Sequence, residues 1–253
     1  MSADRVLARA DGAVLHLTLN RPDKRNAIDA PMVDALLEQL TAADLGAQVR
    51  VIALRGAGTD FCSGADLTEL LASVDQSAEI NAANAERLGR VFTTLREMPK
   101  PVVAVVHGRA LAGGCGLATA CDMVLARDDA TFGYPEVHRG FVPAMVMAML
   151  RRAVGEKVAF DLVATGRSLT AQEALGLGLI TRVVPAHRFE TDVAHLLADL
   201  AALSPSAVAL TKRLLYAADT VGFDAAIALG ARVNAVVRGT PDFKEAVEKF
   251  LKR

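Results

Sequence analysis

The sequence predicts an α/β fold in which short apolar strands alternate with amphipathic helices. Apolar runs of strand length stand at 14–20, 49–56 and 101–108, and each run ends at a polar turn or at glycine. Helical spacing dominates from about residue 141, and the tail from residue 204 is mostly helical. We therefore expect a layered core of mainly parallel strands, followed by a separate helical region.

Turn and capping residues mark the elements in the first half of the chain. The run VLHLTLN at 14–20 has the alternation of a strand and ends at the polar turn NRPDKRN. Asp29 is the expected N-cap of the next helix, with Pro31 in its first turn and MVDALLEQLTAAD at helical spacing behind it. VRVIALRG at 49–56 and PVVAVVHG at 101–108 predict buried strands, and CGLATACD predicts a helix after the second of them.

The second half is mostly helical. MVLARDDATFGYPE predicts a strand, a turn and a short extended piece. SLTAQEALGLG begins with the capping pair Thr170 and Glu173 and stops at glycine. SPSAVALTKRLLYAAD, FDAAIALGARVNAVVRG and DFKEAVEKFLKR predict the helices of the tail. We place the division between a core at 1–197 and a C-terminal helical region at 198–253.

Composition excludes several classes of protein. Hydrophobic residues make up 52% and charged residues 23% of the 253 residues, which excludes a disordered chain. The net charge of −1 offers no basic field for nucleic acid or anionic lipid. The start MSADRVLARADG lacks a signal pattern, and no apolar run reaches the length of a membrane span. Cys62, Cys115 and Cys121 lack metal-site spacing, so we expect reduced thiols in a cytoplasmic protein without a metal.

Two glycine-rich stretches stand where a strand gives way to a helix: LRGAGTDFCSGADL at 54–67 and VHGRALAGGCGLATACD at 106–122. Such a junction presents unpaired backbone N–H groups and the positive end of the helix dipole, which suits a phosphate or an oxyanion. Neither stretch fits G-x-x-x-x-G-K-[ST], and the acidic residue of a dinucleotide fold is missing, which disfavours phosphate. For either stretch alone, glycines that only permit tight packing are the alternative.

The motifs ALRGAGTDFCSGADL, PVVAVVHGRALAGGCGLATACDMVLARDDATFGYPEV and GLGLITRVV together resemble the crotonase superfamily of enoyl-CoA hydratases and isomerases. The resemblance runs from about residue 12 to the C-terminus, and 101–137 is its most specific part. It implies a spiral core of repeated ββα units and a C-terminal helical region that builds homotrimers, often paired into hexamers.

The resemblance also implies a chemistry. The family binds acyl-CoA thioesters and stabilises an enolate with two backbone N–H groups, which align with Ala65 and Gly113. The catalytic glutamate aligns with Glu136 in GYPEV. Two fixed donors in a dry pocket interact more strongly as charge develops on the thioester oxygen. No cofactor is expected, because coenzyme A is part of the substrate.

One position departs from the two-glutamate pattern of the hydratases. The place of the other glutamate is taken by Gly116. One carboxylate suffices to shuttle a proton from a 3-enoyl to a 2-enoyl thioester, and it can also serve hydration if water and the α-carbon lie on the same side of it. We consider Glu69, Tyr134 and His138 as further pocket residues, with His138 more simply explained as a satisfied or exposed histidine.

The resemblance places the coenzyme A portion of the substrate on the turn after the first strand. The expected contacts are Lys24, Arg25, Asn26 and Ala27 in that turn, Ser63 and Asp66 in the first glycine stretch, and Phe250 and Arg253 in the last helix, often from a neighbouring subunit.

Three functions remain open at this point. The leading one is an enoyl-CoA hydratase or isomerase, in fatty-acid or amino-acid catabolism. The second is another enolate reaction on the same scaffold, such as thioester hydrolysis, decarboxylation or dehalogenation. The third is a non-catalytic acyl-CoA-binding or RNA-binding relative, against which Glu136, both glycine stretches and the near-neutral charge all argue.

Overall fold

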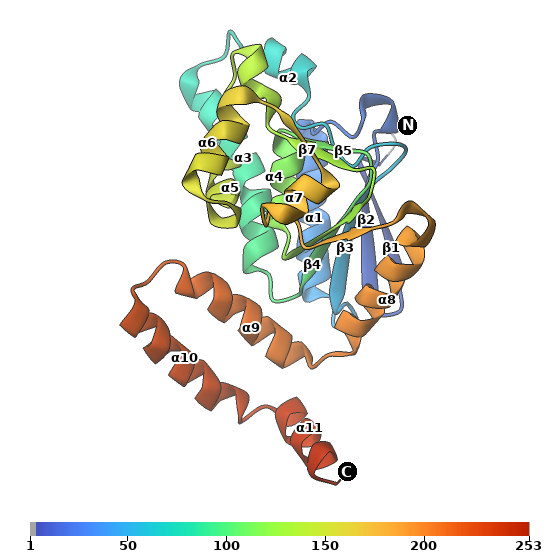
Figure 1. The fold of residues 1–253 in the computed structure, drawn as a ribbon, viewed down its shortest axis with the longest axis vertical. Coiled ribbons are helices and arrows are strands. Elements are labelled where there is room, and N and C mark those ends of the chain that lie inside the picture. The colour runs from blue at the N-terminus through green and yellow to red at the C-terminus, as the bar shows by residue number, and fades with distance from the viewer. Residues whose placement is uncertain (1–3, 253) are drawn as a thin grey trace.

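The computed structural model describes residues 4–252, which form two β-sheets, a set of helices around them and a helical arm (Figure 1). One sheet has six strands in the order β1-β2-β3-β4-β6-β9, and the other has three in the order β5-β7-β8. The strands are β1 (Val6–Asp11), β2 (Val14–Leu19), β3 (Val51–Gly56), β4 (Val102–Val106), β5 (Arg109–Leu111), β6 (Met123–Arg127), β7 (Thr131–Gly133), β8 (Ser168–Thr170) and β9 (Arg182–Val184).

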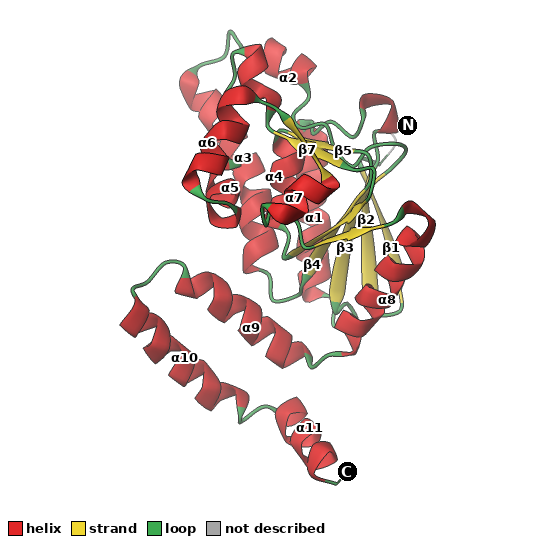
Figure 2. Cartoon of the chain, in the orientation of Figure 1, coloured by secondary structure: helices red, strands yellow, loops and turns green. Residues whose placement is uncertain are grey.

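Helices make up most of the remaining chain (Figure 2). The α-helices are α1 (Ala30–Leu45), α2 (Leu67–Ala72), α3 (Ala78–Glu97), α4 (Gly113–Ala120), α5 (Met147–Ala153), α6 (Glu156–Thr165), α7 (Ala171–Gly176), α8 (Phe189–Ala202), α9 (Pro205–Ala218), α10 (Phe223–Val237) and α11 (Pro241–Leu251). Three short 3-10 helices are η1 (Pro22–Lys24), η2 (Pro135–Arg139) and η3 (Ala186–Arg188).

The chain winds as a spiral because successive strands belong alternately to the large sheet and to the small sheet. β4 lies in the large sheet, β5 lies in the small one, and α4 follows; β6, β7 and η2 repeat that order. β4 pairs with β6 and β5 pairs with β7, both in parallel, so that consecutive turns of the spiral stack on one another. The predicted α/β fold with a ββα spiral is thereby confirmed.

The local predictions agree with the structure where the sequence carries its own capping group. The carboxylate of Asp29 accepts from the backbone N–H of Met32 at 3.0 Å and caps α1. The hydroxyl of Thr170 and the carboxylate of Glu173 form a complete capping box at α7.

The structure adds elements that the sequence did not indicate. β1 forms an antiparallel hairpin with β2, and α3 spans the polar, alanine-rich segment after α2. β8 and β9 each have three residues, within a region where helical spacing dominates. Three residues are too few to show the alternation by which a strand is recognised.

The central strands β3 and β4 of the large sheet are buried on both faces, which accounts for their continuous apolar sequences. In β3 the side chains of Val51 and Ala53 pack with those of α8, whereas Ile52 and Leu54 belong to the main core with α1, α3 and α4. The residues of α8 at this interface are Phe189, Val193 and Leu197, spaced by four and therefore on one helix face.

Helices α9, α10 and α11 form an arm that extends away from the sheets, and α11 lies at the far end of the molecule from α2 (Figure 1). Helix α8 continues through the boundary drawn between residues 197 and 198, and the chain turns at Leu203 before α9. The division into a core and a helical region stays a prediction. No single helix within residues 4–252 is long and apolar enough to cross a bilayer, although the bent pair 186–202 and 205–218 meets the length and composition criteria together.

A buried ion pair fastens the arm to the core. The Lys212 ammonium group on α9 lies 2.8 Å from the Asp122 carboxylate and donates to two core carbonyl oxygens, at 2.7 and 3.0 Å. The Tyr216 hydroxyl donates to the other Asp122 oxygen at 2.7 Å. Burial lowers the pKa of Lys212, and the neighbouring Asp122 opposes that shift.

Replacing Lys212 with methionine should lower the free energy of unfolding by about 3 kcal/mol, because the partly buried Asp122 carboxylate then loses its cation. Urea denaturation at neutral pH measures this loss. The matched control is Lys157→Met on the exposed surface of α6, where the change should stay within about 0.5 kcal/mol. Equal losses in both variants would contradict the anchoring role.

Candidate active site

The first glycine loop follows β3 and is hydrogen-bonded to β5. The backbone N–H of Cys62 donates to Arg109 O at 3.0 Å, and the N–H of Leu111 donates to Cys62 O at 2.9 Å. The buried Cys62 thiol donates to Asn26 O at 3.1 Å, and burial raises its pKa to about 12, so the sulfur stays protonated. Cys62 therefore acts as a structural residue of this loop.

The backbone N–H group of Ala65 points away from the neighbouring chain segment, which contains Ile28. Ile28 N–H donates to Gly64 O at 2.8 Å, and Asp66 N–H donates to Ile28 O at 2.9 Å. In an extended segment, successive peptide groups point to opposite sides. The N–H of Ala65 thus faces away from Ile28.

The second glycine loop places the start of α4 close to Ala65. Ala112, the N-cap, has φ 52° and ψ −126°, a conformation that residues with a side chain rarely adopt. Its N–H donates to Gly133 O at 2.8 Å, which ties the loop to the end of β7. Gly113 is the first helical residue, and its N–H is one of the donors that no carbonyl of the helix can satisfy.

The two loops touch where Gly64 meets Ala112 and Gly113. A Cβ atom at Gly64 would lie 2.8 Å from the Ala112 Cβ and 3.2 Å from the Gly113 nitrogen, and Gly64 has φ 94°. A Cβ at Gly113 would lie 3.8 Å from the Ala65 nitrogen. The structure thus brings the two predicted oxyanion donors, Ala65 and Gly113, to one small space, and glycine at position 64 permits the approach.

Glu136 lies on η2, three residues beyond the end of β7. Only 7% of the residue is exposed, and its Oε2 atom is buried without a hydrogen-bond partner among the described residues. Burial raises the pKa of Glu136, while its own backbone N–H and Arg139 oppose the shift. A buried carboxylate with a free oxygen and a raised pKa has the character of a proton carrier.

The space beside Gly116 is filled by Val146. A Cβ at Gly116 would lie 2.1 Å from Val146 Cγ1 and 2.9 Å from Val146 Cβ. Val146 is 4% exposed and belongs to the main core. The chain therefore lacks the second carboxylate at this position and has no room for it either.

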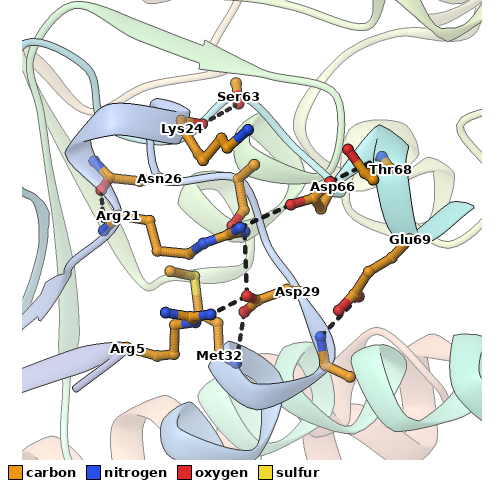
Figure 3. Close-up of polar contacts among 12 residues, drawn as sticks. Arg5, Arg21, Lys24, Asn26, Asp29, Met32, Ser63, Asp66, Thr68 and Glu69 are labelled. Carbon is orange, nitrogen blue, oxygen red and sulfur yellow. Dashed lines mark hydrogen bonds and ion pairs between the residues drawn. The ribbon is translucent and has the colours of Figure 1, made fainter. Parts of the chain in front are cut away.

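Figure 3 shows how the turn after β2 is joined to the first glycine loop. The side chain of buried Asn26 donates from Nδ2 to Ala57 O and to Asp60 O, both at 2.8 Å, and accepts from Arg21 N–H. Arg21 in turn contacts the Asp66 carboxylate at 2.8 Å. These contacts bring together the predicted coenzyme A residues Lys24, Arg25, Asn26, Ala27, Ser63 and Asp66, of which Lys24 and Arg25 are exposed.

The structure gives the surroundings of the three further residues that the sequence suggests for the pocket. The Glu69 carboxylate accepts from Ala30 N–H at 2.9 Å, at the N-terminus of α1, because that end of the helix attracts an acidic group (Figure 3). The ring of His138 contacts Thr165 O at 2.8 Å and is exposed, which agrees with a satisfied histidine. Tyr134 is wholly buried in the core, and its hydroxyl oxygen has no hydrogen-bond partner among the described residues.

The last helix does not reach the site within one chain. Phe250 is 75% exposed on α11, at the opposite end of the molecule from α2. Arg253 lies outside the described residues. Their contact with coenzyme A stays a prediction that involves another subunit.

Several residues that shape the site carry no recognisable signal in the sequence. Arg21 stands in the predicted polar turn, and only its contacts with Asp66 and Asp29 show that it holds two segments together. The Asp60 carboxylate makes a bidentate pair with the Arg109 guanidinium, at 2.7 and 2.9 Å. Val146 had no local signal, because it meets Gly116 only through the packing of α5 against α4.

Comparison with known proteins gives the family. The family model described as enoyl-CoA hydratase/isomerase matches residues 9–253. The chain belongs to the enoyl-CoA hydratase/isomerase family. A Thermus thermophilus protein that carries the enoyl-CoA hydratase name is 40% identical over 96% of each chain. The 2,3-dehydroadipyl-CoA hydratase of Escherichia coli is 34% identical over 95% of this chain and 92% of that protein. The crystal structure of an enoyl-CoA hydratase from Mycobacterium smegmatis has a TM-score of 0.94 at 32% identity, over 98% of this chain and 96% of that one.

Replacing Ala112 with glycine should raise the free energy of unfolding by about 1 kcal/mol, because glycine adopts the strained conformation without a steric cost. The midpoint of urea denaturation measures the change. Ala118→Gly, inside the same helix, is the matched control and should lower stability by about 1 kcal/mol. A loss of stability in Ala112→Gly as large as in the control would show that the backbone at 112 is unstrained.

Placing a methyl group at position 116 should also reveal the contact with Val146. We expect Gly116→Ala to lower the free energy of unfolding by about 2 kcal/mol, because a β-branched core side chain has little freedom to move aside. In the presence of Val146→Ala the same change should cost at least about 1 kcal/mol less, which a double-mutant cycle measures. Additive losses would mean that the two positions do not compete for space.

Proposed function

We propose that this protein is an enoyl-CoA hydratase/isomerase that stabilises a thioester enolate with two backbone N–H groups and uses Glu136 as its single catalytic carboxylate. Two observations carry the proposal: the Oε2 atom of Glu136 is buried without a hydrogen-bond partner among the described residues, and the backbone of Ala65 lies close to Gly113 at the start of α4. Family membership supports the substrate class, and the relatives named above as hydratases support the type of reaction.

The donors are suited to a charge that appears during the reaction. With the thioester oxygen between Ala65 N–H and Gly113 N–H, removal of a proton from the adjacent carbon moves negative charge onto that oxygen. Fixed donors need no reorganisation at that moment, and loss of one such donor typically costs about 3–4 kcal/mol in the barrier. The dipole of α4 adds to this effect, because its positive end carries Gly113.

Glu136 supplies the proton transfer. For a 3-enoyl thioester, the carboxylate takes a proton from C2, the electrons pass into a dienolate, and the same proton returns at C4. For hydration of a 2-enoyl thioester, Glu136 takes a proton from water as the oxygen bonds to C3, and that proton is delivered to C2. Both routes balance with one carboxylate and need no resident cofactor.

The coenzyme A portion is assigned to the surface between η1 and the first glycine loop. Lys24 and Arg25 are exposed there and carry the charge that the phosphates require. Asn26 is buried and bonded to the loop, so its contribution is to fix the backbone of the turn.

We infer a homotrimer or hexamer in the cytoplasm as the working form. Helices α10 and α11 have no buried residue, and they expose Phe223, Ile227, Val236, Phe250 and Leu251. An apolar arm of this kind is suited to burial against further copies of the chain. The three buried thiols fit a reducing compartment.

Glu136→Gln should lower kcat for crotonyl-CoA hydration and for 3-hexenoyl-CoA isomerisation by about 10²–10⁴-fold, since the amide cannot accept the proton. Hydration is measured by the loss of the conjugated enoyl absorbance, and isomerisation is measured by its gain. Glu38→Gln on the exposed side of α1 is the control and should keep wild-type rates. Turnover that persists in Glu136→Gln would remove Glu136 from the mechanism, and a wild type without either reaction would reject the proposed function.

The pH dependence of kcat/KM should reflect the raised pKa of Glu136. The reacting form is the carboxylate, so kcat/KM should fall as the pH drops through a value above the ordinary 4.5. The same shift means that ionisation destabilises the folded state, an effect that grows as the pH rises from the unfolded pKa to the folded one. Glu136→Gln should therefore be at least as stable as the wild type at pH 7 in thermal denaturation, and a clear loss there would contradict the assignment.

A further inference from the structure

The side chain of Arg21 is 12% exposed and contacts two separate chain segments (Figure 3). Its Nη1 atom donates to Ala27 O at 2.7 Å and lies 3.3 Å from the Asp29 carboxylate. Its Nη2 atom donates to the Asp66 carboxylate at 2.8 Å. Both carboxylates are largely buried as well, so water weakens these charge interactions little.

The two segments are those that orient the Ala65 N–H. Residues 27–29 and 64–66 meet in an isolated parallel bridge between Ile28 and Ala65. The bridge consists of two hydrogen bonds, from Ile28 N–H to Gly64 O at 2.8 Å and from Asp66 N–H to Ile28 O at 2.9 Å. A pairing this short is marginally stable by itself, so a side chain that binds both segments fixes its geometry.

The turn assigned to coenzyme A has an anchor of its own. Asn26 Nδ2 donates to Ala57 O and to Asp60 O, both at 2.8 Å. Asn26 Oδ1 accepts from the backbone N–H of Arg21 at 2.9 Å, a contact that does not involve the guanidinium group. Removal of that group should therefore disturb the bridge and leave the turn in place.

The three acceptors around Arg21 suit an arginine. A guanidinium group presents N–H donors from separate nitrogen atoms in fixed directions, whereas lysine presents all of its donors from one nitrogen on a flexible chain. Burial acts to raise the pKa of Asp66, but hydrogen bonds from Arg21 and from Thr68 N–H hold it below its ordinary value. The contact between Arg21 and Asp66 is thus a charge-assisted hydrogen bond of defined geometry.

We propose that Arg21 is a positioning residue for the oxyanion donor at Ala65: its guanidinium group holds residues 27–29 against 64–66 and so fixes the direction of the Ala65 N–H. The inference rests on the proposed function, in which that N–H stabilises the thioester enolate. A misplacement of about 1 Å can lower the rate by about 10²-fold. Because the donor acts most strongly in the transition state, its displacement should lower kcat and leave KM unchanged.

The test compares Arg21→Lys with Arg5→Lys. Arg5 also contacts the Asp29 carboxylate, at 2.8 Å, but among the described residues its side chain makes no hydrogen bond to 64–66. Arg21→Lys should lower kcat by about 10–10²-fold at unchanged KM, for whichever of crotonyl-CoA hydration and 3-hexenoyl-CoA isomerisation the wild type catalyses. Arg5→Lys should keep the wild-type kcat.

A second readout follows the donor without turnover. Acetoacetyl-CoA has an acidic carbon between two carbonyl groups, and its enolate absorbs in the near ultraviolet, so the enolate fraction bound to excess protein reports how well the oxyanion is stabilised. Arg21→Lys should lower this absorbance, and Arg5→Lys should match the wild type. Circular dichroism checks folding. If Arg21→Lys does not fold, Asp66→Asn, which keeps an oxygen for Thr68 N–H, should show the same losses.

The outcomes separate the two claims. Equal kcat and enolate absorbance in Arg21→Lys and Arg5→Lys, a rise in KM at constant kcat, or unfolding of both Arg21→Lys and Asp66→Asn would overturn the positioning role, and the proposed function stands if the wild type turns over either substrate. Enolate absorbance that depends on Arg21 in a protein without turnover would keep the role of Arg21 and reject the proposed function. A wild type with neither signal would overturn both.

Discussion

The contact between Gly64 and Ala112 joins two loops that are far apart in the sequence, and the rest of the site is arranged around it. On one side of the contact is the Ala65 N–H, turned away from Ile28 by the pairing of its neighbours. On the other side is the Gly113 N–H at the start of α4. Because both are main-chain groups, their position follows from backbone packing, and a side chain at 64 would push the two loops apart.

The polar groups of this region fall into two kinds. Those that hold the loops in place are satisfied: the amide of Asn26 has three hydrogen bonds, and Asp60 is paired with the guanidinium of Arg109. The Oε2 atom of Glu136 is buried and has no hydrogen-bond partner among the described residues, as is also true of the Tyr134 hydroxyl, and an unpaired buried carboxylate oxygen lowers the stability of the fold. That contrast supports catalysis at Glu136 and scaffolding at the others.

Helix α4 links the site to the arm. Its first residue, Gly113, carries one donor, and Asp122 just beyond its end receives Lys212 and Tyr216 from α9. The helix has eight residues, so the two ends lie about 12 Å apart at 1.5 Å per residue. The arm and the predicted donor at Gly113 are thus connected through one short helix.

Much of the fold could be predicted because its signals are local. The strands at 14–20, 49–56 and 101–108 carry their apolar pattern within a few residues, and Asp29 caps its helix through a contact three residues away. The family motifs likewise identified both glycine loops and the position of Glu136. The short strands β8 and β9 escaped prediction because they exist only through pairing with β7 and β6.

The α/β class, the helix caps, the two glycine loops and the lack of a carboxylate at position 116 all follow from the order of the amino acids alone. The packed fold is needed to show where Glu69 points, which chain segments Arg21 connects, and what fills the space beside Gly116. Each of these depends on a contact between residues distant in the chain: Glu69 with Ala30, Arg21 with Asp66, and Gly116 with Val146. Composition and periodicity report on neighbours in sequence, whereas these contacts arise from how whole elements pack, and for that reason no local pattern records them.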